Sequence, residues 1–136
     1  MKKPNIYEFD TVIYPRHLWV SIDAPTSALN ELFPEGDTLD APFVDMADKT
    51  NAITDRVRKL TPEPQGGILI RFKSVAKMTP PIMAHEAFHA MMGILDYINS
   101  YPAISNQEPA AYLIEFIVKC CEKAKSYYEK ELSDGK

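Results

Sequence analysis

The sequence lacks any uncharged run long enough to cross a membrane. A spanning helix needs about 20 consecutive apolar residues, whereas even the apolar residues 110–121 are interrupted by Glu115 and Lys119. An excess of positive charge is also missing, because the formal net charge is -4. Nucleic acids and anionic membrane surfaces both require a basic protein face. We therefore expect neither a nucleic acid nor a membrane among the partners.

Cysteine is scarce, and the two that occur, Cys120 and Cys121, are adjacent. On a helix, neighbouring side chains point about 100° apart, which does not suit a disulfide between them. The N-terminus reaches Pro4 and Glu8 before any apolar segment, so we expect no signal peptide. These features favour a reducing, cytoplasmic setting.

Internal repeats, low-complexity tracts and linkers are absent as well. The 136 residues suit one domain and leave no room for a second core. Hydrophobic residues make up 46% of the chain and charged residues 25%, a balance typical of globular proteins. The sequence predicts a single domain over residues 1–136.

The N-terminal half is expected to form short strands. Residues 24–48 contain several prolines, which predicts a loop with one helical turn at 27–33. Residues 51–60 suit either a helix or a strand, and the connection that follows favours a strand. The expected strands are Tyr7–Tyr14 and Leu18–Ile22, forming a hairpin, then 51–60 and Ile68–Phe72.

The C-terminal half is expected to form two helices. Thr79 can cap the first helix, which then continues to about Ser100. Pro102 ends that region, and Pro109 begins a second helix that runs to about Leu132. A short turn between them predicts an αα-hairpin.

The first predicted helix contains the motif His85-Glu86-Ala87-Phe88-His89, an HExxH sequence. Residues four apart lie on one helix face with about 6 Å of rise between them, so the two imidazoles can bind one tetrahedral ion. Zinc suits this pattern, and the glutamate is placed to move protons to and from a water on the ion. The sequence therefore predicts an α+β fold, with a small N-terminal antiparallel sheet packed on a C-terminal αα-hairpin that carries HExxH.

The alternative is a surface helix with two exposed histidines and a glutamate. Apolar residues surround the motif and would then bury unpaired polar groups, which favours a metal site. These neighbours are Ala87, Phe88, Met91 and Met92.

A catalytic zinc requires a third protein ligand, and Glu108 is our choice. It lies at the start of the second helix, and an antiparallel arrangement of the two helices would place that first turn beside the histidines. Residues 105–108 also have the form of a capping box, in which Glu108 would contact only a backbone amide. Asp96 lies roughly 10 Å further along a straight helix than His89 and needs a break at Gly93 to reach the ion. Glu115 is a weaker candidate, better suited to pairing with a lysine.

The motif resembles the gluzincin arrangement, in which an HExxH helix is followed by a helix with a glutamate ligand. The closer resemblance is to small HExxH proteins of bacteriophages and bacterial mobile elements. It rests on MAHEAFHAM at residues 83–91 and EPAAYLI at residues 108–114. A metzincin pattern does not fit, since Met92 and Leu95 occupy the positions where it requires a glycine and a ligand.

The resemblance implies zinc ligands at His85, His89 and Glu108 and a catalytic acid and base at Glu86. It also implies a zinc-dependent peptidase acting on a peptide or protein substrate. Pro109, directly after the implied third ligand, departs from the pattern.

Substrate contacts are expected on the strand before the motif, at Ile68 and Ile70, where an extended peptide would add to a free strand edge. This strand can equally be an interior member of the sheet. Tyr112 is a candidate to stabilise an oxyanion, with core packing as its alternative. The alternative function is a catalytically inactive, zinc-stabilised protein-interaction module, or one without metal, and the sequence leaves the oligomeric state open.

Overall fold

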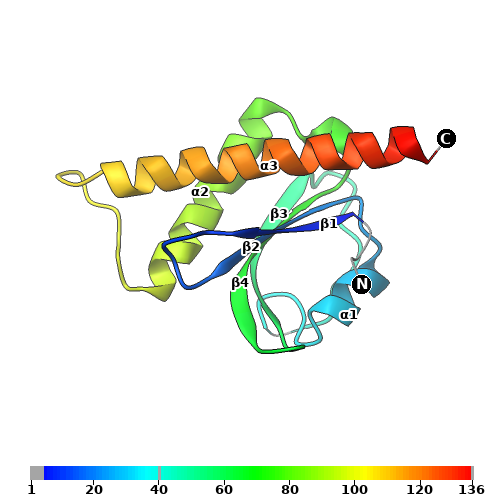
Figure 1. Cartoon of the computed structure of the whole chain (residues 1–136), viewed down its shortest axis with the longest axis horizontal. Helices are drawn as coiled ribbons and strands as arrows, with labels where there is room; N and C mark the ends of the chain where they lie inside the picture. The colour runs from blue at the N-terminus through cyan, green and yellow to red at the C-terminus, as the bar shows by residue number, and fades with distance from the viewer. Residues whose placement is uncertain (1–4, 40, 136) are drawn as a thin grey trace.

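A four-stranded mixed sheet separates a layer of two long helices from a layer formed by one short helix and its loops (Figure 1). The computed structural model describes residues 5–39 and 41–135. The elements are β1 (Ile6–Asp10), β2 (His17–Ile22), α1 (Thr26–Leu32), β3 (Ala52–Lys59), β4 (Gln65–Phe72), the 3-10 turn η1 (Val75–Lys77), α2 (Pro80–Tyr97) and α3 (Glu108–Asp134).

The strand order is β1-β2-β4-β3, so the prediction of an antiparallel sheet is wrong. The hairpin of β1 with β2 and that of β3 with β4 are antiparallel, but β2 and β4 are parallel. Leu18 lies opposite Ile68 and Val20 opposite Ile70 in this parallel pair. The reason is that β3 takes the outer edge and reverses directly into β4, which then enters the sheet between β3 and β2.

The central position of β4 follows from its side chains. Ile68, Ile70 and Phe72 are buried in the core beneath α2 and α3, while Leu69 is buried on the opposite face. A strand that is apolar on both faces is most stable inside a sheet covered on both sides.

The prediction of an αα-hairpin is also wrong, although both helices exist. Residues 98–107 separate α2 from α3, a longer connection than a helical hairpin uses. At 27 residues, α3 extends across the molecule and crosses α2 in Figure 1, packing against both α2 and β2. HExxH therefore belongs to α2 alone. No helix in the part of the chain that the structure describes is long and apolar enough to cross a membrane.

The opposite face of the sheet has its own core, built around Trp19. Its ring centroid lies 5.0 Å from that of Phe33, which in turn lies 6.2 Å from that of Phe43. Leu29 of α1 is fully buried in the same cluster. This aromatic cluster holds the segment after α1 against the sheet.

Two adjacent glycines in β4 offer a test of the parallel pairing. A Cβ on Gly67 would lie 2.0 Å from the carbonyl oxygen of His17, whereas the nearest atom to a Cβ on Gly66 is 3.7 Å away. Gly67→Ala should therefore lower the free energy of unfolding by about 3 kcal/mol, through forced separation of β2 and β4. Gly66→Ala is the matched control and should change it by less than about 1 kcal/mol. Urea denaturation measures both, and equal stability of the two variants would contradict the register.

Candidate functional site

The two histidines of HExxH lie on the exposed face of α2, one turn apart. Thr79 is the residue before the helix, in extended conformation, but its side chain makes no capping hydrogen bond. Pro80 and Pro81 form the first turn, as predicted. The Nε2 atoms of His85 and His89 are 3.3 Å apart. Both side chains thus present the same ring nitrogen to one point in space.

This separation fits two ligands of a tetrahedral ion. Two nitrogens at 2.0–2.1 Å from zinc, at the tetrahedral angle, lie about 3.3 Å from one another. The pair therefore has the geometry of two vertices of a zinc site.

Glu86 differs from its histidine neighbours because it is buried, with only 6% of its surface exposed. Its Oε1 accepts a hydrogen bond of 2.7 Å from the hydroxyl of Thr54 on β3. Its Oε2 lies 3.9 Å from Nε2 of His85. The carboxylate is thus held from below by the sheet while one oxygen faces the histidine pair.

Two hollows meet at Glu86. One, of about 500 Å³, is lined by residues 53–56 of β3 together with Glu86, His89 and Gly93. The other, of about 330 Å³, is lined by Asn51, His85 and Glu86 and by the first turn of α2. Because β3 is the last strand in the sheet order, its outer edge is unpaired by any other named strand. A groove therefore runs between α2 and the free edge of β3, past the buried carboxylate.

The structure does not bring Glu108 to the histidines. It is exposed in the first turn of α3, two residues before the buried Ala110. Two residues correspond to about 200° around a helix, so Glu108 faces away from the side of α3 that packs on the core. Within residues 5–39 and 41–135, no three His, Cys, Asp or Glu side chains are arranged to hold a metal. The alternative of a capping box over residues 105–108 is not formed either, because the residue before this helix is Gln107 and no side-chain hydrogen bond caps it.

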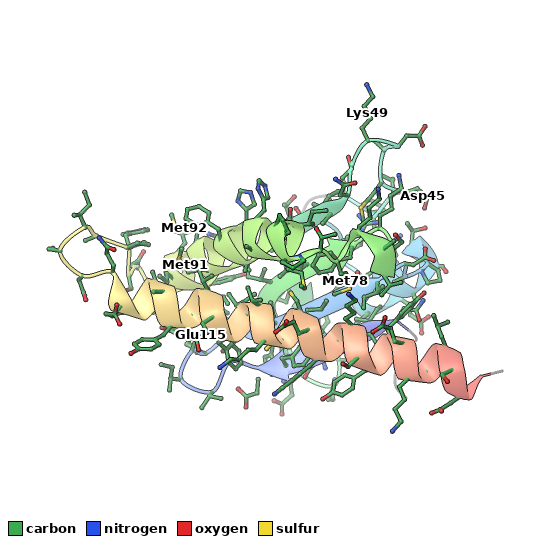
Figure 2. All side chains as sticks on the ribbon, turned by 90° about the horizontal axis from the view of Figure 1, so that it is seen from above. Asp45, Lys49, Met78, Met91, Met92 and Glu115 are labelled. Atoms are coloured by element: carbon green, nitrogen blue, oxygen red, sulfur yellow. The ribbon has the colours of Figure 1, made fainter. Side chains whose placement is uncertain are left out.

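The two weaker candidates have structural partners. The helix continues through Gly93 without a break, and Asp96 pairs with Arg56 of β3. That hydrogen bond keeps the pKa of Asp96 below its ordinary value. Glu115 accepts a 3.1 Å hydrogen bond from Lys119 and points away from α2 in Figure 2.

The predicted substrate residues have different positions from those expected. β4 is paired on both sides, so Ile68 and Ile70 have no free edge to offer a peptide. Ile68 still lines the groove with its side chain, whereas Ile70 is fully buried. Tyr112 is 66% exposed and lies in an apolar hollow with the β1–β2 turn. It thus neither packs in the core nor lines the groove.

Sequence reasoning missed Thr54 and Asp55, which line the groove from β3. Burial of the Asp55 carboxyl group, together with the neighbouring carboxyl group of Asp37, raises its pKa to about 7. The sequence did contain a signal for them, because Thr54 and Asp55 are adjacent polar residues in a segment otherwise typical of a strand. Adjacent side chains of a strand point to opposite faces of the sheet. Thr54 faces α2, and Asp55 faces the other way.

Comparisons with sequence profiles of protein families, with curated proteins and with solved structures found no match for this chain.

The contact between Thr54 and Glu86 predicts a stability difference. Thr54→Val removes the hydroxyl and leaves a buried carboxylate oxygen without its donor, which should cost about 1–3 kcal/mol of unfolding free energy. Thr54→Ser keeps the hydroxyl and should recover most of that loss. Chemical denaturation compares the two, and a Thr54→Val variant as stable as Thr54→Ser would show that the hydrogen bond contributes no net stability.

Proposed function

We propose that the chain is a zinc-dependent peptidase-like protein in which His85 and His89 hold the metal and Glu86 moves the protons. The observation that supports this most directly is the conjunction of two imidazole nitrogens 3.3 Å apart with a buried carboxylate beside them. Zinc, when bound, would polarise a peptide carbonyl and acidify a water molecule.

The groove supports an extended peptide as the substrate. Residues 53–56 form one wall along an unpaired strand edge, and α2 forms the other. An extended segment can add to such an edge through backbone hydrogen bonds, and this addition fixes its direction and register. The strand proposed to bind the peptide is therefore β3, and not β4, as the sequence suggested.

Glu86 has the features needed for proton transfer. The Thr54 hydroxyl occupies one carboxylate oxygen and fixes the orientation of the side chain. The other oxygen faces the histidine side, where it can accept a proton from a nucleophilic water and donate it to a leaving amine. Burial of this side chain restricts bulk water around it.

A purely structural zinc site receives less support. Both histidines come from one turn of one helix and are exposed, so an ion bound to them alone would not link separate elements. Structural zinc sites stabilise a fold by closing a complete ligand set. We also propose a cytoplasmic setting, in which the buried Cys120 and Cys121 stay reduced.

Zinc content tests the metal proposal. Protein purified without a histidine tag or chelator should contain one zinc per chain by plasma mass spectrometry. His85→Ala and His89→Ala should each lose it, because each removes one of two vertices. Glu108→Ala should weaken binding only if the first turn of α3 closes on the histidines when the ion binds. A wild-type chain without zinc after growth in zinc-supplemented medium would overturn the proposal.

Turnover tests the role of Glu86. Glu86→Gln should retain zinc and keep the Thr54 contact, since the amide oxygen can accept the same hydrogen bond, yet lose at least about a hundredfold in rate. Cleavage of a fluorogenic peptide library by zinc-loaded wild type and variant measures the difference. Glu115→Gln, on the outer face of α3, is the matched control and should cleave at the wild-type rate. Activity retained by Glu86→Gln would exclude this residue as the proton carrier.

A further inference from the structure

The two parallel strands end side by side, and a hollow lies at their carboxyl ends. Ser21 of β2 is opposite Arg71 of β4, and each strand ends one residue further on. The hollow, of about 300 Å³, is lined by these strand ends, by the residues directly after them, and by Asp45 and Met46 of the loop that follows α1. Parallel sheets commonly bind ligands at the carboxyl ends of their strands.

Arg71 contributes a buried positive charge to this hollow, with only 5% of its surface exposed. A guanidinium carries five N–H donors. Within the described residues, its one acceptor is the Val44 carbonyl, 3.0 Å from Nη2. The guanidinium carbon also lies 5.3 Å from the centre of the Phe43 ring, so the group is held in place. Charged side chains are almost never fully buried unless they are paired.

The neighbouring carboxylates do not complete that pairing. Asp37, Asp55 and Asp45 lie close enough to favour the charged form of Arg71, whereas burial lowers its pKa. In the part of the chain that the structure describes, none of the three forms an ion pair with the guanidinium. An anionic group in the hollow would supply the missing partner of a buried charge.

The rest of the hollow limits which anion it suits. Two negative side chains, Asp23 and Asp45, line it together with Lys73 and Arg71. A phosphate, with up to two negative charges, would be repelled by the two carboxylates. A ligand that carries an ammonium group beside its carboxylate would be attracted by both kinds of side chain.

Backbone contacts fix these side chains in place. Asp23 has a left-handed φ of 49°, which aspartate tolerates better than most residues, and its amide donates to the Phe72 carbonyl at 3.0 Å. Lys73 Nζ donates to the carbonyls of Ala47 and Asp48 at 3.1 and 3.0 Å, which fastens the loop that carries Asp45. That loop projects on the side of the molecule away from α3 (Figure 2). The hollow is thus preformed.

We propose that this hollow binds a free α-amino acid, whose carboxylate pairs with Arg71 and whose ammonium group pairs with Asp45 and Asp23. The buried Ser21 hydroxyl is a further donor for the carboxylate, and Met46 offers apolar surface to the ligand side chain. A volume of about 300 Å³ is at the lower end for small-molecule sites, which suits a ligand of this size. The hollow shares no lining residue with the groove beside HExxH and requires no zinc, so it stands independently of the proposed function.

Amide NMR of the zinc-free chain tests the site, with the common amino acids added one at a time at millimolar concentration. At least one should shift the resonances of residues 21–24, 45–46 and 71–73 saturably and leave those of residues 85–89 unchanged. Its N-acetyl derivative lacks the ammonium group, and its amide lacks the carboxylate. Each derivative should bind at least about tenfold more weakly, because each loses one charge-assisted contact.

A variant in the exposed loop tests the ammonium contact without disturbing the core. Asp45→Asn should weaken binding of the amino acid by about tenfold, because the amide carries no charge. Binding of the N-acetyl derivative, which has no ammonium group, should not change. Asp48→Asn is the matched control, since it removes a charge from the same loop at a side chain that does not line the hollow, and it should bind as the wild type does.

Three results would overturn the proposal. The first is that no amino acid shifts these resonances. The second is that inorganic phosphate shifts them as strongly, which would indicate a site for anions in general. The third is that Asp45→Asn binds the amino acid as tightly as the wild type. Zinc content and peptide cleavage enter none of these readouts, so failure of the amino-acid site is distinct from failure of the proposed function.

Discussion

The burial of β4 on both faces is the constraint on which the rest of the structure depends. Because this strand is apolar above and below, each face of the sheet must be covered. The helix layer covers one face and the α1 layer the other. The same placement pushes β3 to the outside of the sheet, so its free edge lies beside α2. The candidate groove is therefore a consequence of where the most hydrophobic strand had to lie.

Local patterns predicted most elements but not how they pair. The hairpin of β1 and β2 and the starts of α2 and α3 follow from period and from proline positions, whereas the strand nature of 52–59 follows from the connection after it. The parallel pairing of β2 with β4 joins segments separated by α1, a long loop and β3, and no local signal specifies such a contact. The continuous run Ile68-Leu69-Ile70 was the available clue, since a strand at a solvent-facing edge would alternate.

The candidate site likewise combines residues whose positions local sequence predicts with residues whose positions it does not. His85, Glu86 and His89 lie within two turns of one helix, so the sequence alone could predict their geometry. Thr54 lies 32 residues before Glu86 and reaches it only because β3 takes the edge position. Glu108 shows the opposite case: its place before Ala110 in α3 turns it outward, which the assumed hairpin had concealed.

The two faces of the sheet also differ in their chemical reporters. The only tryptophan, Trp19, lies in the α1-side core, whereas both cysteines lie in the core beneath α2 and α3. Burial raises the pKa of Cys120 to about 11 and that of Cys121 to about 12, so thiol reagents can modify them only when the helix layer opens. The fluorescence of Trp19 therefore reports on the α1 layer, and chemical modification of the two cysteines reports on the layer of α2 and α3. The natural sequence thus allows the order in which the two layers loosen to be followed without an added label.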